Sequence, residues 1–184
     1  RFAFLILMAA TYVNGVEAAT IRVPQDVATI QGAINAATNG DVVLVSPGTY
    51  FEKINIFFKV LTVQSEQGPE LTIIDGSNHA GSVVTFQGDS TPGQRSILSG
   101  FTIQNGSAIV GGGVFIQSAS PKIENNIIRD NEANSGAGSF MTGTVLGSAL
   151  IEANRIVDNR IIDNQLVNST FPGGGGIQVH NTSS

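Results

Sequence analysis

A six-residue motif recurs along this chain at nearly constant spacing and strongly limits how the chain can fold. Residues 126–131 read NIIRDN and recur at residues 154–159 as NRIVDN, so that Asn126 matches Asn154. An earlier copy, GFTIQN at residues 100–105, places Gly100 at the position of Asn126. Each repeat holds about three short strands and cannot bury an apolar face alone. The repeats are therefore expected to stack as parallel sheets around one core, with equivalent residues roughly 4.8 Å apart.

The segments around the motif have the pattern of short strands joined by tight turns. Runs rich in β-branched residues, such as residues 42–45 and 101–103, end near Gly, Asn, Pro or Asp. Glycine-rich strand starts recur at residues 111–115, 136–140 and 173–177. No helical crossovers separate the runs, and propeller blades need repeats of about 40 residues or more. The sequence predicts an all-β fold, a parallel β-helix or solenoid.

The composition excludes several other classes of protein. Charged residues make up 12% of the 184 residues, against an average of roughly 25%, which excludes disorder and a coiled coil. The formal net charge of -5 argues against nucleic acid as a partner. The chain has no Cys, so disulfides and Cys-ligated zinc are excluded.

One helix is expected, over residues 29–39. Ile30, Ala33, Ile34 and Ala37 fall on a single face. The hydroxyl of Thr29 is placed to cap the N-terminus of this helix, and Asn39-Gly40 supplies a left-handed residue to end it. A helix at this point suits the role of covering the open end of a stack of strands.

The two ends of the chain carry further expectations. Residues 1–18 have one Arg followed by nine apolar residues, a stretch too short for a membrane span and typical of a secretory signal peptide. Residues 19–184 would then form the β-helix domain, with coils from about residue 41, in a secreted, periplasmic or cell-surface protein. The last residues look like the middle of a coil, so a C-terminal cap is expected to be missing. An open coil predicts edge-to-edge self-association.

The N-terminal part resembles a known family. This part is similar to the start of right-handed parallel β-helix proteins of the pectin-lyase-like superfamily, and the resemblance extends over about residues 20–180. The segments that carry the resemblance are residues 21–24, 29–34, 40–45, 47–52 and 68–76. It implies a right-handed β-helix with a short capping helix. The superfamily includes pectin methylesterases and polysaccharide lyases, but no complete catalytic set of either is found here.

Stacked acids make one candidate metal site. If the two copies of the motif stack in register, Asp130 and Asp158 lie one above the other and repel by roughly 3 kcal/mol at an effective dielectric of 20. Calcium would relieve this repulsion with oxygen ligands from both acids and from Asn131 and Asn159, and Asp163 could join them. Lyases of this fold often hold calcium in this way. The residue pattern favours the alternative in which these acids lie at the ends of strands and hydrogen-bond the backbone of their own turns.

Basic residues near these acids are the candidates for catalysis. Arg129 and Arg155 could grip the carboxylate of a polyuronate, and Lys122 is a conceivable base. The favoured alternative is that the arginines neutralise neighbouring acids and that Lys122 is an exposed turn residue. Asn126 with Asn154 is expected to form a structural ladder. A second ladder is expected from Asn105, Asn131 and Asn159.

Two functions remain open at this point, and the sequence does not decide whether the protein is an enzyme. The first is an exported β-helix that binds or presents a polysaccharide or cell-surface ligand without a catalytic set. The aromatic content of 7%, with no Trp, counts against it. The alternative is a lyase or hydrolase that acts on acidic glycans, with calcium as a possible cofactor.

Overall fold

The computed structural model describes residues 17–88 and 94–142, together with the backbone of four later strands. The described strands form four sheets in which every pairing is parallel. Sheet A contains β1 (Thr20–Val23), β2 (Val42–Val45), β5 (Thr62–Ser65), β8 (Ile97–Ser99), β12 (Lys122–Glu124) and β16 (Leu150–Glu152). Sheet B contains β3 (Gly48–Tyr50), β6 (Thr72–Asp75), β9 (Thr102–Gln104), β13 (Ile127–Arg129) and β17 (Arg155–Val157).

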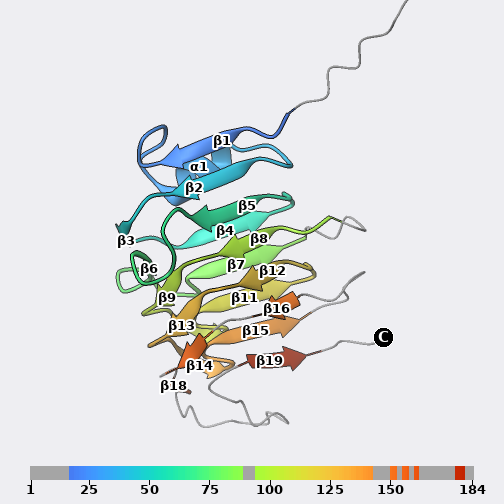
Figure 1. Ribbon diagram of the computed structural model, residues 1–184. Coiled ribbons are helices and arrows are strands. Elements are labelled where there is room, and N and C mark those ends of the chain that lie inside the picture. Colours follow the sequence, from blue (N-terminus) through green and yellow to red (C-terminus); the bar gives the residue numbers. More distant parts are fainter. Residues whose placement is uncertain are drawn as a thin grey trace, which may run out of the picture.

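The other two sheets complete the coils. Sheet C contains β4 (Ile54–Phe57), β7 (Val84–Gln87), β11 (Val114–Gln117), β15 (Ser139–Thr142) and β19 (Ile177–His180). Sheet D is smaller and contains β10 (Ser107–Val110), β14 (Glu132–Ser135) and β18 (Arg160–Ile161). Strands far apart in the sequence lie side by side in a stack (Figure 1). The expectation of an all-β fold built from stacked parallel strands with one helix is confirmed.

The register of the stack is fixed by strand pairing. Ile127 pairs with Arg155 and Glu124 pairs with Glu152, so the predicted match between the two copies of the motif is confirmed. The preceding coil pairs Ile127 with Thr102, so the predicted match of the earlier copy is wrong by one position. This register puts Gly100 level with Asn125, and both have positive φ, of 82° and 55°. The two coils therefore correspond in backbone conformation at this corner rather than in residue type, since both Gly and Asn tolerate the left-handed region.

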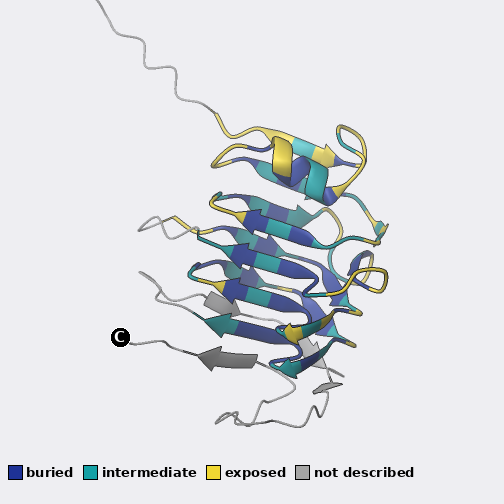
Figure 2. Ribbon diagram, turned by 180° about the vertical axis from the view of Figure 1, so that it is seen from behind, coloured by how far each residue is buried: buried dark blue, intermediate teal, exposed yellow. Residues whose placement is uncertain are grey.

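The core consists of apolar rows that run along the stack. On sheet C, Ile56, Phe86 and Ile116 are in register, and each is 0% exposed. Sheet B contributes the row of Ile74, Ile103 and Ile128 in the same way. Burial therefore alternates along most of the central strands (Figure 2), which fixes the register, because a slip of one residue would turn each row outward.

Helix α1 (Ile30–Ala36) covers one end of this stack (Figure 1). The Thr29 side chain caps it by accepting a hydrogen bond from Gly32 N, as predicted. The helix ends before residue 39, because Ala37 is already extended. Lys59 Nζ donates to the carbonyls of Ile34 (2.8 Å), Asn35 (2.9 Å) and Ala37 (2.8 Å). The lysine therefore provides partners for carbonyls at the C-terminal end of the helix, a role that the sequence analysis assigned to Asn39-Gly40.

The N-terminal end of α1 is held by the next coil. Glu52 accepts hydrogen bonds from the backbone amides of Ile30 (2.9 Å) and Gln31 (3.0 Å). The side-chain amide of Gln31 bonds both backbone groups of Asn55, on the first described strand of sheet C. The side chain of Gln31 thus makes the hydrogen bonds that a neighbouring strand would make, and it pairs backbone groups at the edge of sheet C that would otherwise be open.

Two buried asparagines hold the corners of the coils. Asn126 Oδ1 accepts from Phe101 N (2.9 Å), and its Nδ2 donates to Leu98 O (3.1 Å). Asn131 is 0% exposed and accepts from Gly106 N (2.8 Å). The predicted ladder of Asn105 with Asn131 is wrong, because Asn105 lies level with Asp130, whose carbonyl accepts from Asn105 N (3.2 Å). Asn154 and Asn159 lie outside the described residues.

Candidate functional site

The predicted basic residues lie on different sheets. Lys122 is part of strand β12 in sheet A, so the prediction of a turn residue is wrong. Its Nζ lies 2.9 Å from Glu124 Oε2, on the same outward face of the strand. Arg129 ends β13 in sheet B. Arg155 begins β17, opposite Ile127 rather than Arg129. The described residues therefore do not bring Lys122 and Arg129 together as a base with a carboxylate-binding partner.

Asp130 has the features of a corner residue. It has a φ of 53°, and Asn105 holds the equivalent position one coil earlier with a φ of 59°. Arg129 Nη1 lies 3.6 Å from Asp130 Oδ2, with both side chains nearly half exposed. This pairing agrees with the interpretation that the arginine neutralises the neighbouring acid. The side chain of Asn131 is buried, and its Oδ1 accepts a hydrogen bond from Gly106 N. This oxygen therefore points into the corner of the coil and not toward the exposed carboxylate of Asp130.

Calcium binding stays a prediction. Asp158 and Asp163, the other two candidate ligands, lie outside the described residues. Within the described part of the chain, no three His, Cys, Asp or Glu side chains gather closely enough to hold a metal ion.

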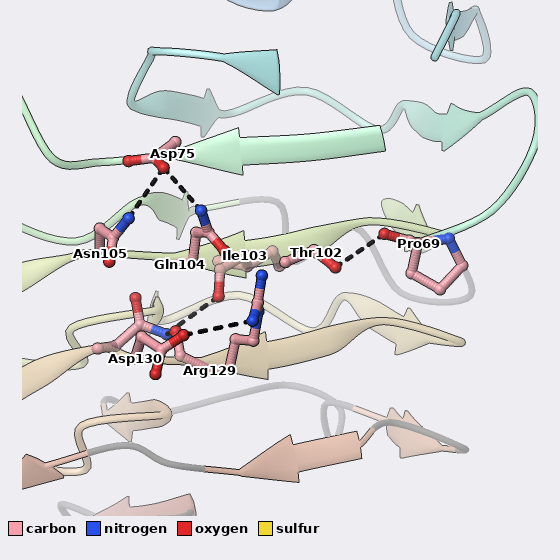
Figure 3. A network of polar contacts seen from close by, with 9 residues as sticks. Pro69, Asp75, Thr102, Ile103, Gln104, Asn105, Arg129 and Asp130 are labelled. Carbon is pink, nitrogen blue, oxygen red and sulfur yellow. Dashed lines mark hydrogen bonds and ion pairs between the residues drawn. The ribbon is translucent and has the colours of Figure 1, made fainter. Parts of the chain in front are cut away.

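A polar network surrounds Asp75 at the end of sheet B (Figure 3). Asp75 Oδ2 accepts from Gln104 Nε2 (2.7 Å) and Asn105 Nδ2 (2.9 Å), and Oδ1 accepts from Ser77 N (2.9 Å). Burial alone would raise the pKa of Asp75, but these hydrogen bonds outweigh it and hold the pKa below its ordinary value. The hydrogen bonds from Gln104 and Asn105 join Asp75 to the next coil. Because Asp75 is 5% exposed and its pKa is lowered, it is poorly suited to act as an acid or base at neutral pH.

A groove of about 630 Å³ opens beside the outer face of sheet C. It is lined by β10, where Ile109 is 76% exposed, and by residues 80–82 of the preceding coil. Phe115 of β11 lies at the groove, with Asn134 of β14. The groove exists because β10 is the first described strand of sheet D and pairs only at Ser107 with residues 80 and 81 of the preceding coil.

Phe115 is supported from the next coil. It is in register with Phe140, and the two rings stack with centroids 6.2 Å apart and an angle of 25° between their planes. Phe140 is 9% exposed, whereas Phe115 is half-buried and lines the groove. A ring restrained by its neighbour on the adjacent strand presents a rigid apolar surface, the kind on which a sugar ring packs with little loss of entropy.

The sequence analysis missed this aromatic pair, although the sequence carried the signal. The glycine-rich strand starts at residues 111–115 and 136–140 each end in Phe. Strand pairing brings these two segments together in register, with Phe115 directly opposite Phe140. A low overall aromatic content therefore does not exclude an aromatic surface when two rings fall in register.

A second hollow, of about 340 Å³, lies beside the capping helix. It is lined by Gln31 and Asn35 of α1, Asn55 and Phe57 of β4, and Lys59. Gln31 and Lys59 are already bonded to backbone groups of the cap. The hollow is therefore a by-product of the way the helix is fastened, and the groove at Phe115 is the better candidate.

These features define a class of protein: a stack of parallel strands capped by a helix, with a groove along its side. The chain belongs to the DUF1565 family, described as proteins of unknown function, whose family model matches residues 13–183. Neither a curated protein nor a solved structure matched the chain. No helix in the described residues is long and apolar enough to cross a membrane.

Proposed function

We propose that this protein is an exported, right-handed parallel β-helix of the pectin-lyase-like type that binds a polysaccharide beside sheet C without cleaving it. The observation that carries the proposal is the groove lined by Phe115, whose ring is braced by Phe140. The right hand follows from the strong preference for right-handed crossovers between parallel strands. Export is supported by the apolar stretch within residues 1–18.

The separation of the candidate catalytic residues also supports binding over cleavage. Lys122 bonds Glu124 on sheet A, and Arg129 pairs with Asp130 at the end of sheet B. A lyase needs a base and a carboxylate-neutralising group around one sugar, because proton abstraction requires both at hydrogen-bond distance. The described residues do not form such a set.

Affinity electrophoresis of the full chain through gels that contain individual polysaccharides would test the proposal. We expect retardation by at least one polysaccharide and no increase in reducing ends or unsaturated products in a parallel incubation. Phe115→Ala should weaken retardation roughly tenfold, the loss that follows from removing an aromatic contact of about 1.4 kcal/mol.

Phe58→Ala is the matched control, because Phe58 is 74% exposed and lines neither hollow. It should bind as the parent chain does. Cleavage of an acidic glycan by the parent chain would instead establish the enzyme hypothesis. Absence of retardation by every polysaccharide would remove the proposal.

A further inference from the structure

We infer that the ligand of this groove is a neutral glycan, whose chain runs along the stack from Phe115 across the outer face of sheet C. The inference rests on the proposed function and adds the class of ligand. It follows from the lack of charged residues on the described outer face of sheet C, from the net negative charge of the chain and from the polar groups that surround Phe115.

The outer face of sheet C carries no charged residue on β4, β7, β11 and β15, the strands of this sheet whose side chains are described. Burial alternates in β4, β7 and β11, so the outward residues of these strands are the more exposed ones between buried neighbours. In β15 the outward positions are those in register with Phe115 and Gln117. The outward residues are Asn55, Phe57, Thr85, Gln87, Phe115, Gln117, Phe140 and Thr142. Amides and hydroxyls both donate and accept hydrogen bonds, as sugar hydroxyls do, and none of these groups neutralises a carboxylate.

The lysines that flank sheet C are engaged with backbone carbonyls. Lys53, just before β4, donates from Nζ to Ala80 O at the edge of the groove. Lys59, just after β4, bonds three carbonyls of the helix cap. Lys59 uses its three donors in the cap, whereas Lys53 keeps its charge and can donate further hydrogen bonds at the edge of the groove. The net charge of -5 nevertheless disfavours the approach of an acidic glycan over the whole molecule. A neutral chain does not meet this repulsion.

The groove supplies an apolar contact with polar groups around it. Phe115 offers the ring, and Ile109 the exposed wall. Ser107, at an exposed position, and Asn134 lie around them with a hydroxyl and an amide group. Ser82 is 9% exposed, and its hydroxyl donates to Val110 O (3.4 Å). This combination matches a pyranose, which has apolar C–H faces and a rim of hydroxyls.

The rows of sheet C give the direction of the chain. Gln117 lies two residues from Phe115 on the same face and is exposed. It is in register with Gln87 on one side and with Thr142 on the other. Equivalent side chains repeat at roughly 4.8 Å along the stack, so an extended chain lying across the strands meets a hydrogen-bonding group at every coil.

Affinity for neutral and acidic glycans, measured at low and high salt, tests the inference. The full chain and two charge variants, Gln117→Glu and Gln117→Lys, would each be titrated with neutral and with uronate-containing oligosaccharides. A neutral ligand predicts an affinity that is the same at both salt concentrations in the parent chain and in both variants, since screening acts only on charge pairs. Both variants lose the Gln117 amide, so Glu and Lys should lower the affinity to a similar extent rather than in opposite directions. Gln64→Glu, on the outer face of sheet A, is the matched control.

Groove variants locate the ligand. Ile109→Ala should lower affinity several-fold, whereas Leu71→Ala, which truncates an aliphatic side chain that is also exposed, should not. Tighter binding of acidic oligosaccharides that weakens with salt and improves in Gln117→Lys would overturn the inference while leaving polysaccharide binding intact. Failure of both classes to bind would remove the proposed function itself. Binding that Ile109→Ala and Leu71→Ala reduce equally would place the ligand elsewhere.

Discussion

Replacing Asn131 with Ala should be among the most damaging single changes to this fold. The side chain is 0% exposed and forms hydrogen bonds to Gly106 N (2.8 Å), Ile103 O (3.1 Å) and Arg129 O (2.8 Å). Alanine would leave the buried Gly106 amide without this acceptor, at a cost of about 1–3 kcal/mol, and would weaken two carbonyls as well. We expect a loss of about 3 kcal/mol in the free energy of unfolding. For a chain of this size that lowers the midpoint of thermal unfolding by about 6–12 °C.

The neighbouring asparagine is the comparison. Asn105 is exposed, and its amide donates one hydrogen bond, to Asp75 (2.9 Å). Asn105→Ala should cost about 1–2 kcal/mol, mostly because alanine disfavours the φ of 59° at this corner. Thermal unfolding followed by circular dichroism measures both variants. Equal losses in the two would refute the reasoning, because a ladder in which these asparagines are equivalent predicts equality.

Three further predictions concern the cap, the carboxylates and calcium. Lys59→Met should destabilise the chain by about 2 kcal/mol through lost charge-assisted hydrogen bonds and speed amide exchange in α1; unchanged exchange would show that the cap does not depend on this lysine. The pKa values of Asp41 and Asp75 are lowered, Asp41 chiefly by the backbone amide of Thr38 and Asp75 by hydrogen bonds that outweigh burial. Their stabilisation should therefore persist at neutral pH and disappear as the pH falls below about 4, and an acid titration of stability without such a fall would contradict it. Asp130→Asn should change stability by less than about 0.5 kcal/mol in calcium-free buffer, because Asn105 fills the same corner one coil earlier. A calcium-induced rise in the parent's melting temperature that this variant loses would establish Asp130 as a ligand.

Much of the architecture could be predicted because repetition and periodicity act locally. The cap on Thr29 follows from side-chain chemistry, and the pairing of Ile127 with Arg155 follows from a motif repeated almost intact. The register of the earlier coil could not be read by matching letters. Asn105 looks like Asn131, but the backbone makes it equivalent to Asp130, since both hold the left-handed corner.

The candidate site was harder to predict because it depends on an interruption of the repeat. Strand β10 has no full partner in the preceding coil, and the resulting step opens the groove. The position of this step is set by loop lengths, which the motif does not record. The importance of Phe115 emerges only when its register with Phe140 is known.

Hydrogen exchange of the full chain with and without a saturating neutral oligosaccharide would test the central claim most directly. We expect slower exchange in residues 80–82 and 107–110, which line the groove, and in β11 beside Phe115. Exchange at the corner that contains Asp75, Arg129 and Asp130 should not change. Protection at that corner, with the groove unchanged, would contradict the account and return the search for the site to the charged end of sheet B.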